Sequence, residues 1–184
     1  HNFEFQPFLK QNDIIKSCDL ALFESTYSDI KRSFTKKDCI IEREDFRNTL
    51  LNTIQNKSRC LVPTFSFSRG QMLMCWIYDW FKDLKDNFQV VIDSKLFQEI
   101  NNAYTQILED EDLEYWEKVI SWDRFKFVGD YKETLELSSK NDGIPRIILS
   151  SSGFMEAGRV RTWATKILNN KEDTICFVGY SAPN

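Results

Sequence analysis

The sequence predicts an α/β protein of three layers (α/β/α), with a mostly parallel, doubly wound sheet of about six strands between helices. Two observations carry this prediction. Short apolar runs alternate with segments of helical periodicity along the 184 residues, which is the pattern of strand–helix–strand units. The runs at residues 147–149 and 175–178 are apolar without interruption, as in strands that helices cover on both faces.

The expected strands span residues 20–23, 59–65, 89–92, 124–128, 146–149 and 174–178. Helical spacing of apolar residues predicts helices over residues 42–56, 112–120 and 131–137, and a further helix that carries Val160, Trp163 and Ile167. Two more helices begin after Ser68 and after Asp93-Ser94, because these residue types cap helix N-termini. Residues 141–143 (Asn-Asp-Gly) indicate a turn.

Composition limits the class of protein. With 42% apolar and 14% aromatic residues the chain is globular, and its length fits one domain with a sizeable core. The formal net charge of −4 means that no overall basic field attracts nucleic acid. A polyanion would therefore need a local patch of positive charge.

The cysteines and the single histidine limit the chemistry. Five cysteines are widely spaced without a C-x-x-C pair, and four of them (Cys18, Cys60, Cys75 and Cys176) fall in apolar runs. We therefore expect free, reduced thiols and a cytoplasmic protein, with no signal peptide or membrane span. His1 is the only histidine, so the chain cannot supply the histidine-rich ligand set of a catalytic zinc site.

Polar loops follow three expected strands, at residues 23–29, 63–71 and 150–159. Because the carboxyl ends of parallel strands share one edge of a sheet, these loops are expected to converge. The last one, called the opening loop below, places Ser151, Ser152 and Gly153 after a buried strand. Hydroxyl groups and backbone N–H groups there can donate hydrogen bonds to a phosphate. Glycine, which has no side chain, lets the backbone approach such a ligand closely. The alternative is a polar strand-to-helix turn without a ligand.

The same loops carry a family resemblance. Glu24–Asp29 is similar to E-S-T-Y-G-D, with Ser28 in place of glycine. Residues 63–71 resemble P-x-F-x-x-G-R-x-Q, with Ser68 in place of glycine; the glutamate that usually follows this motif is Met72 here. Residues 151–159 resemble S-S-G-M-x-x-x-G-R, with Phe154 in place of methionine. Residues 177–183 resemble F-V-G-Y-Q-A-P. Four motifs in this order resemble the β-CASP domain of the metallo-β-lactamase-fold RNA-processing nucleases.

The resemblance implies a cap domain that holds RNA over a cleft, while a metallo-β-lactamase domain of the same polypeptide binds two zinc ions that activate water. Residues 1–184 would then be one β-CASP-like domain, with residues 1–24 at the edge of the metallo-β-lactamase domain. The parent would be a zinc-dependent ribonuclease. The isolated chain would bind no zinc and be inactive, because it lacks the metal ligands. The partners of this chain would be RNA and the catalytic domain, and it would not bind a membrane. Two further possibilities stay open: a homodimer, and a nuclear location if the parent is eukaryotic.

The resemblance also implies roles for single residues. Glu24 would orient a histidine of the other domain, and so is the expected catalytic residue; the alternative is a structural pairing with an arginine or a helix end. The expected RNA contacts are Thr26, Tyr27, Arg69, Ser151, Ser152, Gly153 and Arg159. For Arg69 we favour bracing of strand-end carbonyls, and for Arg159 a hydrogen bond to its own loop. Phe65 and Phe67 flank a loop where bases could stack, whereas the tryptophans are expected in the core.

Two other functions stay open at this point. A non-catalytic relative would keep the fold as a scaffold in an RNA-processing complex. An unrelated nucleotide-binding α/β module is disfavoured because the chain has neither G-x-G-x-x-G nor G-x-x-x-x-G-K-[ST].

Overall fold

The computed structural model describes residues 7–8, 16–22 and 35–179. In chain order the elements are α1 (Lys36–Gln55), β1 (Arg59–Pro63), α2 (Arg69–Phe81), β2 (Gln89–Asp93), α3 (Lys95–Ile107), α4 (Asp110–Ile120), β3 (Phe125–Phe127), α5 (Tyr131–Ser139), β4 (Arg146–Ser150), α6 (Val160–Ile167) and β5 (Thr174–Ile175). No helix in these ranges is long and apolar enough to cross a bilayer.

The strands form one sheet in the order β3-β2-β4-β1-β5, and each pairing is parallel. β4 lies in the middle, where Ile148 pairs with Leu61 of β1 and with Val91 of β2. All five residues of β4 are buried. A strand without polar side chains at Ile147–Leu149 suits this central position, because both of its faces are covered.

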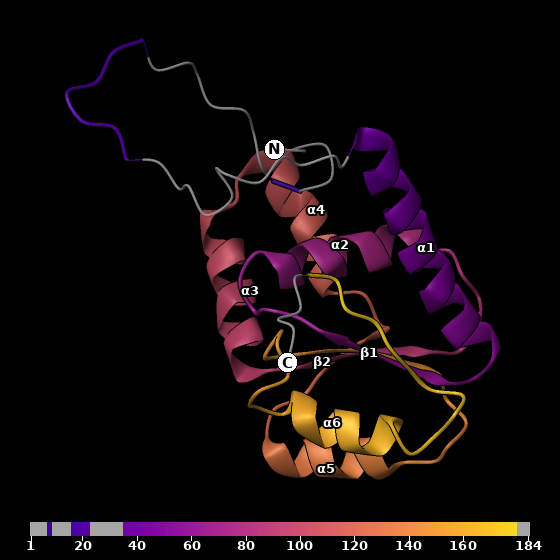
Figure 1. The fold of residues 1–184 in the computed structure, drawn as a ribbon. Helices are drawn as coiled ribbons and strands as arrows, with labels where there is room; N and C mark the ends of the chain where they lie inside the picture. Colours follow the sequence, from indigo (N-terminus) through magenta and orange to yellow (C-terminus); the bar gives the residue numbers. More distant parts are fainter. Residues whose placement is uncertain (1–6, 9–15, 23–34, 180–184) are drawn as a thin grey trace.

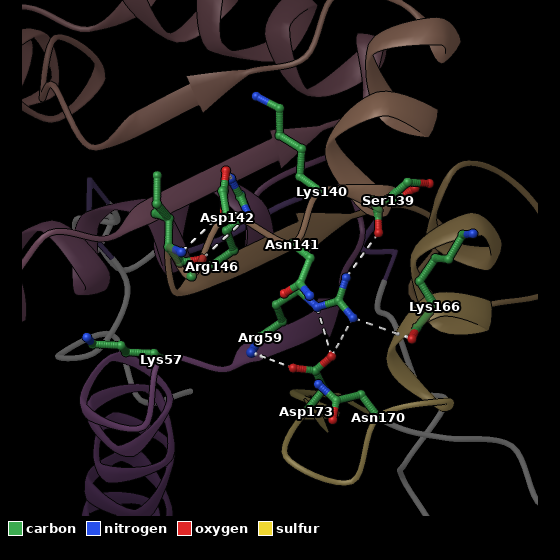
Figure 2. Close-up of a pocket in the computed structure, with 13 residues that line it drawn as sticks. Lys57, Arg59, Ser139, Lys140, Asn141, Asp142, Arg146, Lys166, Asn170 and Asp173 are labelled. Atoms are coloured by element: carbon green, nitrogen blue, oxygen red, sulfur yellow. Dashed lines mark hydrogen bonds and ion pairs between the residues drawn. The ribbon is translucent and has the colours of Figure 1, made fainter.

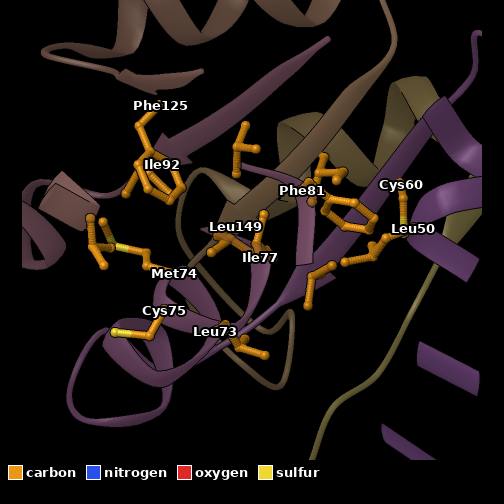
Figure 3. Packing of buried hydrophobic residues seen from close by; sticks show 14 of the residues in the cluster. Leu50, Cys60, Leu73, Met74, Cys75, Ile77, Phe81, Ile92, Phe125 and Leu149 are labelled. Atoms are coloured by element: carbon orange, nitrogen blue, oxygen red, sulfur yellow. The ribbon is translucent and has the colours of Figure 1, made fainter. Parts of the chain in front are cut away.

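Helices cover both faces of the sheet, which confirms the predicted three-layer α/β/α class (Figure 1). α1, α2, α3 and α4 lie on one face, and α5 and α6 lie on the other. Alternate strand residues face the two cores, since Ile147 and Leu149 belong to the larger cluster and Ile148 to the smaller one. Figure 3 shows the larger cluster, to which Leu73, Ile77 and Phe81 of α2 and Leu149 of β4 belong.

Side chains at the expected positions begin several helices. Ser94 accepts a hydrogen bond from the N–H of Phe97 at the start of α3. Asp130 does the same for Glu133 at the start of α5. Ser68 precedes α2 as predicted, but its side chain makes no capping hydrogen bond and its φ is 62°. The position was predicted correctly and its hydrogen bond was not.

Three predicted elements differ from the structure. β5 covers only Thr174–Ile175 of the expected strand 174–178 and lies at an edge of the sheet, so the burial on both faces that was expected for residues 175–178 was wrong. Residues 20–22 of the expected first strand form no strand, and Leu20 and Leu22 are 77% and 88% exposed; Phe23 lies outside the described residues. The described part of the sheet therefore has five strands where about six were expected. α1 begins at Lys36, six residues before the expected start, because Thr35 and Asp38 form a capping box there. Apolar periodicity misses these first turns since their residues are largely exposed.

Candidate functional site at the carboxyl edge of the sheet

The topology singles out the carboxyl end of β4. The chain leaves β1 and β2 into α2 and α3 on one face of the sheet, whereas it leaves β4, which lies between them, into α6 on the other face. Neighbouring strands whose helices diverge leave a crevice at their carboxyl ends, and ligands of open α/β sheets bind there. The opening loop, residues 150–159, occupies this place.

The opening loop lies against the loop that follows β1, as predicted. The N–H of Thr64 donates to the carbonyl of Ser150 at 3.0 Å. The rings of Phe65 and Phe154 meet edge to face, with centroids 5.1 Å apart. A Cβ at Gly153 would lie 3.0 Å from the Phe65 ring and 3.3 Å from its backbone nitrogen. Gly153 therefore allows the two loops to approach each other closely.

Three serine hydroxyls meet beneath the two loops. The hydroxyl of Ser151 donates to that of Ser94 at 2.9 Å, and the hydroxyls of Ser66 and Ser94 are 3.1 Å apart. These serines follow β4, β2 and β1, so three adjacent strands contribute one side chain each. Ser66 and Ser94 are buried and Ser151 is half-buried. Hydrogen bonds between them fix the start of the opening loop.

The remainder of the opening loop turns back on itself. The N–H of Ser152 donates to the carbonyl of Ala157 at 3.3 Å, and the Ser152 hydroxyl contacts the same carbonyl at 3.4 Å. Gly158 has a φ of 87°, and a Cβ there would lie 2.7 Å from the carbonyl oxygen of Ser151. Only glycine fits this turn without strain. Ser152 and Gly153 are thereby held half-buried in the first part of the loop, whereas Phe154 and residues 156–158 are exposed.

A buried carboxylate anchors the end of the opening loop. Asp93, at the last position of β2, is 0% exposed and accepts three hydrogen bonds. They come from the guanidinium of Arg159 at 2.9 Å, the indole N–H of Trp163 at 2.6 Å and the hydroxyl of Thr134 at 3.1 Å. A buried charge is stable only when it is paired and hydrogen-bonded in this way. Asp93 thus joins β2 to α5 and α6.

Sequence reasoning missed this role of Asp93, which was expected only beside Ser94 at the start of a helix. One signal for it was available: a carboxylate directly at the carboxyl end of an apolar strand. Trp163 was correctly expected in the core, and it is 0% exposed. Its indole N–H finds an acceptor there, as a buried tryptophan requires.

Arg159 and Arg69 both brace neighbouring strand ends. Besides Asp93, Arg159 donates to the carbonyls of Val128 and Gly129 after β3 at 3.3 Å. A structural hydrogen bond was expected, but its predicted acceptor, the loop of Arg159 itself, was wrong. Arg69 donates to the carbonyl of Val178, after β5. The bracing that the sequence favoured for Arg69 is therefore present.

The loop after β3 is itself fixed by charge. Glu133 pairs with the ammonium of Lys126 at 2.6 Å and accepts from the N–H of Gly129 at 2.8 Å. The hydrogen bond from Lys126, and to a smaller extent that from Gly129, holds the pKa of the Glu133 carboxyl below its usual value. The carbonyl of Gly129 is thus kept in place for Arg159.

Three predicted site residues, Glu24, Thr26 and Tyr27, lie outside the described residues. The other five (Arg69, Ser151, Ser152, Gly153 and Arg159) are all at the carboxyl edge. Among the residues that the structure describes, no group of three or more histidine, cysteine, aspartate or glutamate side chains is arranged to hold a metal ion. The carboxylate of Asp93 is already occupied by its three donors, so the side chains described at this edge do not fit zinc.

The chain is similar in sequence to a known domain family and to several larger proteins. Residues 70–184 match the family model described as "Beta-Casp domain". The chain is 23% identical over 175 residues to "Transcription termination factor FttA" of Methanococcus maripaludis, covering 89% of this chain and 26% of that protein. It is 26% identical to "Endoribonuclease ysh1" of Schizosaccharomyces pombe, over 90% of this chain and 22% of that protein. "Integrator complex subunit 11" of Danio rerio is 19% identical over 88% of this chain and 26% of that protein.

The chain thus spans about a quarter of the length of these relatives. The family match covers well over half of the chain and includes the opening loop and Arg159. It confirms the resemblance read from the four motifs. The chain belongs to the Beta-Casp domain family.

Proposed function

We propose that this chain is the RNA-clamping cap domain of a ribonuclease that hydrolyses RNA phosphodiesters. The observation that carries the proposal is the position of the opening loop, with the half-buried Ser152 and Gly153, at the carboxyl end of β4 between the diverging connections of β1 and β2. Family membership supports it, and one relative bears the name endoribonuclease.

The roles proposed for this chain's residues are binding and orientation. Ser151 is engaged with Ser94, so its hydroxyl positions the loop. The Ser152 hydroxyl and the backbone at Gly153 are proposed to contact an RNA phosphate. Phe67, 70% exposed in the loop that follows β1, offers a face for base stacking. Arg159 adds little positive charge to this edge, because the Asp93 carboxylate balances the charge of its guanidinium.

Zinc is proposed to be bound by the metallo-β-lactamase domain of the same polypeptide, where it would activate the attacking water. Residues 1–24 are proposed as the edge of that domain, and Glu24 as a residue that orients one of its histidines. Alone, the chain is proposed to be inactive. A cytoplasmic location, or a nuclear one in a eukaryote, remains a prediction.

Reading the parent sequence separates the candidate functions. An H-x-H-x-D-H motif before residue 1 and histidines beyond residue 184 would support the ribonuclease. Their absence would favour the second candidate, a non-catalytic scaffold in an RNA-processing complex, which keeps the same loops. Cleavage of end-labelled RNA by the intact protein, with and without a chelator, then tests the activity itself.

An added negative charge tests the RNA contact. Ser152→Glu places a carboxylate in the opening loop, and it should weaken binding of single-stranded RNA by about tenfold through repulsion of phosphate. The matched control is Ser121→Glu, an exposed position at the end of α4, which should leave the affinity within about twofold. Fluorescence anisotropy of labelled RNA measures both. Equal affinities of the two variants would contradict RNA binding at this loop.

A further inference from the structure

A second polar site lies at the opposite edge of the sheet from the opening loop. A cavity of about 320 Å³ opens at the amino ends of β1 and β4. Its walls come from the residues after α1, the turn at 140–144 after α5, and the end of α6 with the turn that follows (Figure 2). The Asn-Asp-Gly turn recognised in the sequence is part of this wall, and the carboxyl-edge site uses none of these residues.

Two arginine–aspartate pairs form the rigid base of the cavity. Arg59 contacts the carboxylate of Asp173 through Nε at 2.8 Å and through Nη2 at 2.6 Å. Arg146 contacts that of Asp142 through Nη1 at 2.8 Å and Nη2 at 2.6 Å. The Arg146–Asp142 pair is bidentate, whereas both guanidinium contacts of Arg59 go to Oδ2 of Asp173, whose Oδ1 accepts from the backbone N–H of Arg59. Several charge-assisted hydrogen bonds thus hold each pair in one orientation. The two guanidinium charges are therefore already balanced by the protein.

The charge that remains is positive. The lining has five cationic side chains against two carboxylates, an excess of three positive charges in a chain whose net charge is −4. The excess comes from Lys57, Lys140 and Lys166. Within the described part of the chain none of the three ammonium groups forms an ion pair, and the side-chain N–H groups of Asn141 and Asn170 have no acceptor there. Figure 2 shows Lys57 and Lys166 on opposite sides of the Arg59–Asp173 pair.

The three lysines lie at the C-terminal ends of helices: Lys166 is in the last turn of α6, Lys140 is the C-cap of α5, and Lys57 follows the C-cap of α1. Cations are favoured at helix C-termini, which lie at this edge of a parallel sheet. Arg59 already meets that demand, because it donates to the carbonyl of Ser138 in α5 at 3.0 Å and to that of Lys166 in α6 at 3.5 Å. Lys57 follows α1 with a φ of 53° and lies outside the helix. The lysines are thus available to a ligand.

We propose that this cavity binds a phosphate group. The volume admits an ion of the size of pyrophosphate, the walls provide several N–H donors, and the excess charge matches an anion with two or more negative charges. The phosphate belongs either to a small organic or inorganic phosphate or to the backbone of an RNA strand. The site contains no residue of the opening loop, so it stands whether or not the parent protein cleaves RNA.

The test is titration of the intact protein with pyrophosphate by isothermal titration calorimetry at low salt. The triple variant Lys57→Gln, Lys140→Gln, Lys166→Gln should lose at least about tenfold in affinity for one pyrophosphate. The matched control replaces the exposed Lys85, Lys118 and Lys132, none of which lines the cavity, with glutamine. It makes the same change in net charge and should shift the affinity less than about twofold. Arg59 and Arg146 are left in place, so the fold is retained and thermal melts verify it.

A second titration, with a labelled single-stranded RNA, distinguishes the sources of the phosphate. If the RNA backbone supplies it, RNA affinity falls in the lysine variant and pyrophosphate competes with RNA. If a small phosphate compound supplies it, pyrophosphate affinity falls and RNA affinity does not. Equal pyrophosphate affinities of the two triple variants, or no pyrophosphate binding at about 1 mM, would overturn the proposal.

Discussion

Asp93 is the residue on which the geometry of the carboxyl edge depends most. Its carboxylate is fully buried and joins groups far apart in the sequence: Thr134 in α5, Arg159 at the end of the opening loop and Trp163 in α6. In return, Arg159 holds the carbonyls after β3. One side chain thus fixes the end of the opening loop relative to two other strands.

Asp93→Asn should lower the free energy of unfolding by about 3 kcal/mol, because it leaves the Arg159 guanidinium without a charged partner and offers an N–H group to other donors. The control is Asp79→Asn, since within the described part of the chain the Asp79 carboxylate accepts a single, exposed hydrogen bond, from the hydroxyl of Tyr115 at 2.9 Å. It should cost less than about 1 kcal/mol. Urea denaturation measures both. A loss below about 1 kcal/mol for Asp93→Asn would show that the network matters little.

Gly158 and Gly143 form a matched pair of glycines with positive φ. Gly158→Ala brings a Cβ to 2.7 Å from the carbonyl oxygen of Ser151, whereas a Cβ at Gly143, with a φ of 69°, meets no atom within 4 Å. Gly143→Ala should cost only the backbone strain, about 1 kcal/mol, and Gly158→Ala about 2 kcal/mol or more. Thermal melts compare the two. Equal costs would mean that the opening loop shifts without resistance.

At the scale of elements, the central position of β4 determines where the loops at both ends of this strand lie. Its neighbours β1 and β2 lead into helices on the opposite face from α6, so the opening loop leaves the sheet between two diverging connections. At its other end, β4 starts with the buried Arg146, 2% exposed, which binds the turn at 140–144 through Asp142. The same strand therefore positions the loops at both edges.

The Asp142–Arg146 pair makes stability depend on pH. The carboxylate of Asp142 accepts hydrogen bonds from the Arg146 guanidinium. These bonds are the main reason that the pKa of Asp142 is lowered from 3.8 to about 2. The folded pKa is depressed, so the contribution is complete above a pH of about 4 and disappears as pH falls toward about 2. Asp142→Asn should cost at most ~2 kcal/mol near pH 6 and distinctly less near pH 3.

Urea denaturation at the two pH values checks this expectation. Asp123→Asn serves as the control, because Asp123 is 83% exposed and 3.9 Å from Arg124. Its effect should be small at both pH values. A cost of Asp142→Asn that does not change with pH would show that the carboxyl titrates as it does in the unfolded chain.

At the scale of the whole molecule, two separate cores hold the sheet. The larger one lies under α1 to α4 and contains Cys60 and Cys75, and the smaller one lies under α5 and α6. Burial is the main reason that the pKa of both thiols is raised, and it brings that of Cys75 to about 12. Cys18, which the sequence also placed in an apolar run, is exposed, because residues 16–22 form no helix or strand.

Thiol labelling should follow this burial. In the native protein iodoacetamide should modify Cys18 within minutes, and Cys60 and Cys75 should react only on unfolding, since both access and thiolate are lacking. Mass spectrometry of tryptic peptides with and without denaturant measures each position. Rapid native labelling of Cys60 would contradict a closed core beneath α1.

The sequence was sufficient for the features that depend on local pattern. Apolar runs located the five strands that form, since β1 to β5 each lie within an expected range or within one residue of it. Hydroxyl and carboxylate caps located the starts of α2 and α3, and four motifs identified the family. It was wrong where a run lacks tertiary partners: residues 20–22 have the apolar side chains of a strand, yet the described sheet gives them no neighbour.

For the site, the sequence placed Arg69, Ser151, Ser152, Gly153 and Arg159 at one edge of the sheet, because loop positions follow from strand order. Which groups contact one another was decided only by the tertiary structure. The acceptor of Arg159 is Asp93, 66 positions earlier in the chain, and the cavity at the amino edge joins segments from Lys57 to Asp173. Local preferences act over a few residues, whereas burial of a charge or the closing of a cavity depends on elements that only the packed sheet brings together.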